Sequence, residues 1–128
     1  MKKNLQANLC KKYPSLFQQH INHDKKSTMP FGIETDDGWY KLIDTLCMVI
    51  KKVETGDLPT QIIQIKQKFG GLRFYVGKAN AEVFGAIRMA EEMSYNICEH
   101  CGSTDNVKRR KKGFVYTLCD KCVEGNAK

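Results

Sequence analysis

Four of the six cysteines in the chain form two closely spaced pairs towards its carboxyl end. Two residues separate Cys98 from Cys101, two separate Cys119 from Cys122, and positions 102–118 lie between the pairs. Two residues between thiolates let one tight turn direct both sulfurs at a single ion, and this spacing is typical of zinc ribbons and treble clefs. Four thiolates also fill the tetrahedral shell of Zn²⁺ and leave no position for water. The spacing therefore predicts a structural zinc site without chemistry at the metal.

The other thiols and one nearby histidine are not expected to bind metal. Cys10 and Cys47 lie far from the pairs in sequence and are interpreted as packing residues. His100 lies between two better-placed ligands. Disulfides, or four free thiols, are the alternatives for the two pairs. However, the stretch MKKNLQANLCKKYP lacks the hydrophobic run of a signal peptide, so we expect a reducing, cytoplasmic location in which paired thiols bind metal.

Five consecutive basic residues lie between the cysteine pairs, in a stretch that favours a β-hairpin. They are Lys108, Arg109, Arg110, Lys111 and Lys112. Because side chains alternate between the faces of a strand, at most three of them could contact one partner together. The net charge of +7 is concentrated at the two ends of the chain, which makes an anionic partner plausible, nucleic acid first. A solvated loop is the alternative interpretation of this run.

A second candidate surface lies on an expected hairpin in the middle of the chain. One face of this hairpin would carry Lys66, Lys68, Arg73 and Tyr75. Cations combined with an aromatic ring are typical of surfaces that bind single strands or RNA, where bases stack and phosphates pair with cations. A solvated sheet face is the alternative here.

Acidic residues in the first third of the chain raise the possibility of a metal-dependent nuclease. Glu34, Asp36 and Asp37 could hold magnesium, with His20 or His23 as base. Helix capping explains the two aspartates as well, and the His20-x2-His23 pair lacks a third ligand at matching spacing. No glycine-rich phosphate loop and no nucleophile with an adjacent base occurs in the sequence. We therefore expect a protein that is not an enzyme.

Hydrophobic periodicity predicts the elements that position these residues. The segment 1–30 is expected to hold one or two short helices, with an apolar cluster that includes Tyr13, Leu16, Phe17 and Ile21. A longer helix follows in IETDDGWYKLIDTLCMVIKKVETG, capped by Asp36 or Asp37 and ended by Gly56.

After Pro59 the period changes to two, which predicts a β-hairpin in TQIIQIKQKFGGLRFYVG. Its turn is placed at Phe69-Gly70-Gly71, and Ile63 and Ile65 are expected on its buried face. Asn80 then caps a helix in AEVFGAIRMAEEMSYNIC, whose buried stripe includes Met93, or Met89 and Ser94 instead.

These elements indicate an α+β fold in which helices pack on a β-hairpin, followed by a four-cysteine module like a zinc ribbon or treble clef. We divide the chain into a basic N-terminal helical segment (1–36), an α-β-β-α body (37–97) and a zinc module (98–128). A hydrophobic content of 41% and a charged content of 27% are ordinary for a globular protein, which argues against disorder. No apolar run approaches the length of about 18 residues that a membrane-spanning helix needs, so no membrane span or membrane partner is expected.

Three motifs also resemble those of a known group of proteins. GWYKLIDTLC, QIKQKFGGLRFYV and the pair CEHCG with TLCDKC, together covering about residues 37–123, are similar to small phage and prophage proteins with a C-terminal zinc-binding module. The resemblance implies a viral or mobile-element origin. It brings no agreed activity with it.

Three functions follow as expectations. The favoured one is a non-catalytic, cytoplasmic zinc-binding protein of phage type that contacts nucleic acid or a nucleoprotein through its basic surfaces. The first alternative is a phage-encoded inhibitor of a host defence protein, such as a nucleic-acid-guided nuclease. The second is the metal-dependent nuclease.

Overall fold

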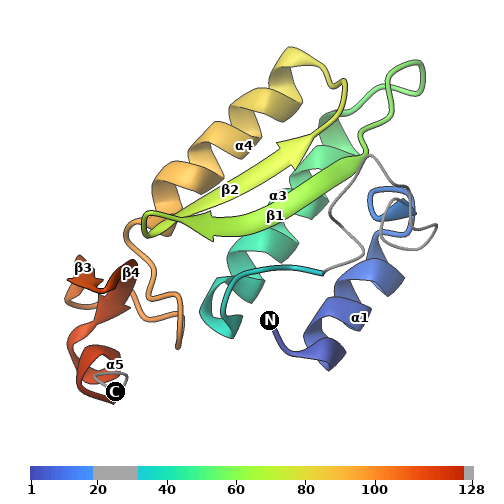
Figure 1. Ribbon diagram of the computed structural model, residues 1–128. Coiled ribbons are helices and arrows are strands. Elements are labelled where there is room, and N and C mark those ends of the chain that lie inside the picture. Colours follow the sequence, from blue (N-terminus) through green and yellow to red (C-terminus); the bar gives the residue numbers. More distant parts are fainter. Residues whose placement is uncertain (19–31, 126–128) are drawn as a thin grey trace.

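A β-hairpin and two helices form the body of the protein. The computed structural model describes residues 1–18 and 32–125 (Figure 1). Strands β1 (Ile62–Lys68) and β2 (Gly71–Val76) are antiparallel, and helices α3 (Tyr40–Val53) and α4 (Ala81–Ser94) lie together on one side of them (Figure 1). A second antiparallel hairpin, β3 (Val107–Lys112) and β4 (Phe114–Cys119), leads into the short helix α5 (Asp120–Gly125). The fold is α+β, as expected.

Helix α3 buries its apolar stripe but begins differently from the prediction. The buried residues recur at helical spacing, as a helix packed on a sheet requires: Leu42, Ile43, Leu46, Cys47 and Ile50. Neither Asp36 nor Asp37 caps it, because a 3-10 turn at Asp37–Trp39 precedes it and Trp39 occupies the N-cap. Asp37 instead accepts a hydrogen bond from the backbone N–H of Lys2 at 2.8 Å. The helix ends at Val53, before Gly56 is reached.

Helix α4 begins as predicted. The side chain of Asn80 accepts a hydrogen bond from the backbone N–H of Val83 at 2.9 Å, which is an N-cap. Ser94 is buried, whereas Met89 and Met93 are exposed, so the stripe with Met93 was wrong and only the Ser94 part of the alternative is correct. The hydroxyl of Ser94 accepts from the backbone N–H of Leu72 at 2.9 Å and thereby joins α4 to the edge of β2.

A β-bulge in β1 changes which residues reach the core. Ile62 pairs with Val76, but Gln64 pairs with Tyr75, so Ile63 is an extra residue on one strand. Ile62 and Ile65 are fully buried and Ile63 only partly. Ile62 thus takes the place predicted for Ile63, because the bulge shifts the alternation by one residue.

The N-terminal residues belong to the same core as the body. Helix α1 (Lys3–Lys12) and the turn after it bury Leu9, Leu16 and Phe17 in the hydrophobic cluster that contains Trp39. Asp44 of α3 anchors this segment, because it accepts hydrogen bonds from Lys12 Nζ at 2.8 Å and from the Tyr13 hydroxyl at 2.7 Å. Burial and the Asp44 carboxylate raise the pKa of Tyr13 to about 12.

Two further features complete the fold. The segment 33–35 runs beside β1, where the backbone N–H of Glu34 donates to the Ile65 carbonyl at 2.9 Å. In the described ranges, no helix is both long and apolar enough to cross a membrane. Ile21, which the sequence assigned to the N-terminal apolar cluster, lies outside the described residues.

Candidate metal centre

The first cysteine pair lies on a tight turn after α4. The backbone N–H of Gly102 donates to the Cys98 carbonyl at 2.8 Å, and the N–H of Cys98 donates to the Ser103 carbonyl at 2.8 Å. Gly102 has φ 84°, a left-handed conformation that glycine adopts without steric cost. The turn therefore presents Cys98 and Cys101 on one side, as their spacing predicted.

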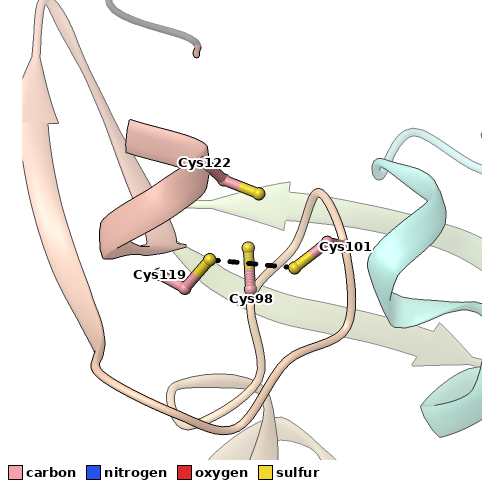
Figure 2. A group of neighbouring side chains, drawn as sticks. All are labelled: Cys98, Cys101, Cys119 and Cys122. Carbon is pink, nitrogen blue, oxygen red and sulfur yellow. Dashed lines mark hydrogen bonds between the residues drawn. The ribbon is translucent and has the colours of Figure 1, made fainter. Parts of the chain in front are cut away.

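The second pair joins a strand to a helix. Cys119 is the last residue of β4, and Cys122 lies in the first turn of α5. Figure 2 shows that the four side chains converge from the turn, the strand and the helix. A turn, a hairpin and a helix that carries the last cysteine form the treble-clef-like variant of the expected module.

The four sulfurs are close enough to hold one metal ion. All lie within 4.8 Å of one another, and the Cys101 and Cys119 sulfurs are 3.7 Å apart (Figure 2). A tetrahedron with Zn–S bonds of about 2.3 Å has edges of about 3.8 Å, which this separation matches. A disulfide needs sulfurs about 2.05 Å apart, and all six cysteines are free thiols. The donor set and its spacing therefore fit a tetrahedral thiolate-bound ion.

The thiols of this group do not ionise equally. A hydrogen bond from the backbone N–H of Cys122, at the start of α5, lowers the pKa of Cys119 to about 7. Burial and the neighbouring sulfurs raise the pKa of Cys122. Thiolates placed this close repel one another, so all four can ionise together only when a cation neutralises them.

The cysteine module is attached to the body at Gly38 and Glu99. The N–H of Gly38 donates to the Glu99 carbonyl at 2.6 Å, and the indole N–H of Trp39 donates to the Ile97 carbonyl at 2.8 Å. A Cβ at Gly38 would lie 2.2 Å from the Cys98 carbonyl oxygen, so only glycine fits there. The Glu99 side chain is buried and accepts from the Asp36 N–H at 3.1 Å, and burial raises its pKa.

A second attachment forms at the tip of the β1–β2 hairpin. The Thr117 hydroxyl donates to the Gly70 carbonyl, and the Gln67 side-chain amide donates to the Val115 carbonyl at 2.9 Å. A Cβ at Gly70 would lie 3.1 Å from Cγ of Arg109. Sequence reasoning missed these contacts, because the partners are far apart in the chain and no local pattern relates them.

The basic run on β3 divides between two faces, as strand alternation predicted. The Arg109 guanidinium lies over the Tyr95 ring, 4.5 Å from its centroid. Arg110 Nη2 pairs with Asp120 Oδ1 at 2.6 Å, and Arg110 Nε donates to the Leu118 carbonyl at 3.1 Å. Lys108 and Lys111 are exposed. The Lys112 side chain lies outside the described part. Two of the five cations thus already have partners within the protein.

The hairpin face predicted from the sequence is present. Lys66 lies directly opposite Arg73, Tyr75 lies opposite Gln64, and Lys68 lies next to the turn. Leu72 and Phe74 are buried on the other face of the hairpin, on the side where α3 and α4 lie (Figure 1). Lys68 and Tyr75 are exposed. Because the hairpin tip is hydrogen-bonded to Thr117, which lies opposite Arg109, the two candidate basic surfaces lie beside each other.

The three carboxylates proposed for a nuclease, Glu34, Asp36 and Asp37, are not gathered into a metal site. Glu34 extends beside β1, Asp37 pairs with Lys2, and the Asp36 carboxylate lies 3.9 Å from His100 Nδ1. Within residues 1–18 and 32–125, the four cysteines form the only group of three or more such side chains close enough to hold an ion. His20 and His23 lie outside those ranges.

Sequence reasoning also missed an apolar groove between α3 and α4. It has a volume of about 740 Å³ and reaches the cysteine turn at Cys101 and Gly102. Met89 and Met93 line it and are exposed, the former by 67%. The sequence could have indicated this groove, because α4 has more large apolar residues than fit on one buried face of the helix.

Comparison of the chain with protein-family models, curated proteins and solved structures gave no match. The resemblance to phage zinc-binding proteins stays a prediction drawn from the motifs. The candidate function therefore depends on the geometry described above.

Proposed function

We propose that this protein is a non-catalytic, zinc-stabilised, cytoplasmic protein that binds nucleic acid or a nucleoprotein. The hydrogen bond from the Thr117 hydroxyl to the Gly70 carbonyl carries the proposal. Because Arg109 lies opposite Thr117, this bond brings the tip of the basic β1–β2 hairpin beside the basic strand β3. Cations on two adjoining elements can contact successive phosphates of one strand, which a single exposed lysine cannot.

Zn²⁺ is the ion we assign to the four cysteines. Thiolate ligands select zinc over magnesium and calcium, and four of them close the coordination shell. The metal would hold the cysteine turn, β4 and α5 together and would itself take no part in chemistry. Its function would be to fix β3 in place against the hairpin tip.

A double substitution tests the nucleic-acid proposal. Lys68→Ala with Lys111→Ala removes two exposed cations from the proposed surface and leaves Arg109 and Arg110, which have internal partners, intact. Affinity for an oligonucleotide, measured by fluorescence anisotropy between about 50 and 200 mM salt, should fall, and the salt slope should decrease by about 1 per lysine.

The matched control is Lys11→Ala with Lys52→Ala, which removes the same charge from exposed positions on α1 and α3. Equal losses in the two double variants would show that only net charge matters and would contradict the assigned surface. Absence of binding by the unaltered protein would contradict the proposal as a whole.

The apolar groove favours a second candidate, contact with a protein. Exposed methionines adapt to varied partners and are frequent at binding surfaces of helical grooves. A phage-encoded inhibitor of a host defence protein, the alternative suggested by the resemblance, would use such a surface. Pull-down from lysate with and without nuclease treatment separates the two candidates: a partner retained after treatment supports the inhibitor, and one that is lost supports nucleic-acid binding.

A further inference from the structure

Phe69 occupies an unfavourable position at the tip of the β1–β2 hairpin. Lys68 pairs with Gly71, so Phe69 and Gly70 form a two-residue turn, and their φ values are 53° and 83°. Positive φ at both residues is the requirement of a type I′ turn, where Asn-Gly is the favoured sequence. A bulky residue in this conformation is strained.

Packing does not explain this phenylalanine. Its side chain is 65% exposed, and the contact recorded for its ring is with the Lys68 ammonium, 5.7 Å from the centroid. An exposed aromatic residue at a turn that asparagine would stabilise better contributes neither to the core nor to the local backbone. Strain that the fold does not need is often found at sites of function.

The surroundings of Phe69 alternate between cationic and aromatic groups. Arg109 lies next to the turn, because a Cβ at Gly70 would be 3.1 Å from its Cγ. Its guanidinium lies over the Tyr95 ring, and the Tyr95 hydroxyl accepts a hydrogen bond from Arg73 Nη1 at 3.4 Å. Tyr75, which is exposed, lies two residues beyond Arg73 on the same face. Aromatic rings and cations thus extend from the hairpin tip along the open face of β2.

We propose that this surface binds single-stranded nucleic acid, with Phe69 and Tyr75 stacked on unpaired bases and Lys66, Lys68 and Arg73 near the phosphates. The inference depends on the nucleic-acid function proposed above and makes it more specific. In a duplex the base faces are already stacked on one another, so exposed rings would gain nothing there, whereas every unpaired base offers a face.

Replacement of Phe69 separates stacking from folding. Phe69→Asn removes the ring and places the residue best suited to the turn, so the melting temperature should stay equal or rise. Affinity for oligo(dT) of about 16 nucleotides should fall by about fivefold to 100-fold, as expected for the loss of one stacked base. Phe69→Trp keeps an aromatic ring at this position and should bind as tightly as the unaltered protein. An abasic strand of the same length should bind Phe69→Asn and Phe69→Trp with equal affinity.

The control is Phe84→Gln, which removes a similarly exposed phenylalanine, 49% accessible, near the far end of α4. Binding is measured by anisotropy for oligo(dT), oligo(U) and a duplex of equal length. Tighter binding of the single strands, weakened by Phe69→Asn but not by Phe84→Gln, supports the inference, and the oligo(dT) and oligo(U) arms then distinguish DNA from RNA.

Two results would overturn it. If the duplex binds as tightly as the single strands, or Phe69→Asn binds as tightly as the unaltered protein, the stacking surface is wrong and the general nucleic-acid function stands. If no nucleic acid binds in any arm, both the stacking surface and the function it depends on are wrong.

Discussion

At the scale of single residues, Gly38 decides how closely the cysteine module approaches the body. Its N–H donates a hydrogen bond to the Glu99 carbonyl. Any side chain at this position would collide with the backbone of residues 98 and 99, which cannot move aside as a flexible side chain could. Gly38 and Trp39 are the first two residues of the motif GWYKLIDTLC. Both donate hydrogen bonds to backbone carbonyls of the segment around the first cysteine pair. The start of this motif thus attaches the cysteine module to the body.

Gly38→Ala is therefore expected to lower the free energy of unfolding by about 1–3 kcal/mol, the cost of overpacking a rigid contact. Urea denaturation of the metal-loaded protein measures it. The matched control is Gly85→Ala inside α4, where a Cβ meets nothing within 4 Å. That change should stabilise the protein by about 0.5–1 kcal/mol, because alanine is the better helix former. Equal effects of the two substitutions would contradict the assigned contact.

At the scale of elements, the body and the cysteine module differ in the size of their hydrophobic cores. The body buries residues from α1, α3, α4 and both of its strands in one cluster. The cluster of the cysteine module consists of Cys98, Leu118 and Cys119, with partly buried neighbours. So small a core rarely sustains a fold, and metal coordination is the usual substitute.

Removal of the metal should therefore unfold the cysteine module and leave the body folded. After chelation, amide protection against hydrogen exchange should be lost in β3, β4 and α5 and kept in α3 and β1, because structural zinc binding supplies folding free energy. Cys101→Ser should behave in the same way, whereas Cys10→Ser, outside the cysteine cluster, should bind one zinc per chain as the unaltered protein does. Uniform loss of protection along the chain would contradict this division.

At the scale of the whole molecule, the hairpin tip connects the four-cysteine cluster to the proposed binding surface. Arg109 and Lys111 are on β3, whose partner β4 ends at Cys119 of the cluster, and Thr117 of the same sheet donates a hydrogen bond to the Gly70 carbonyl. Loss of the metal would release these cations from their place beside Lys68 and Arg73 without removing any of them.

Metal-free protein is accordingly expected to bind oligonucleotide more weakly and with a smaller salt slope. Net charge alone predicts tighter binding by the metal-free protein. The reason is that a zinc bound by four thiolates carries about two more negative charges than four neutral thiols. Anisotropy titrations before and after chelation, with zinc added back, distinguish the two. Tighter binding by the metal-free protein would show that charge, and not the arrangement of the two surfaces, controls affinity.

Local patterns determined much of this protein. The spacing of Cys98, Cys101, Cys119 and Cys122 predicted their meeting, because a two-residue gap permits little besides a tight turn. The alternation around Lys66 and Arg73 predicted a shared face, and Asn80 predicted the start of α4. Each of these depends on neighbours within a few residues or across one turn.

Only the tertiary structure decided the remainder. The bulge at Ile63, the replacement of aspartate capping by a 3-10 turn at Asp37, and the exposure of Met93 all arise where distant segments compete for one position. The hydrogen bond from Thr117 to Gly70 joins residues that no periodicity relates. The sequence by itself specified a metal-binding module and a hairpin, and long-range packing then decided that their basic surfaces adjoin.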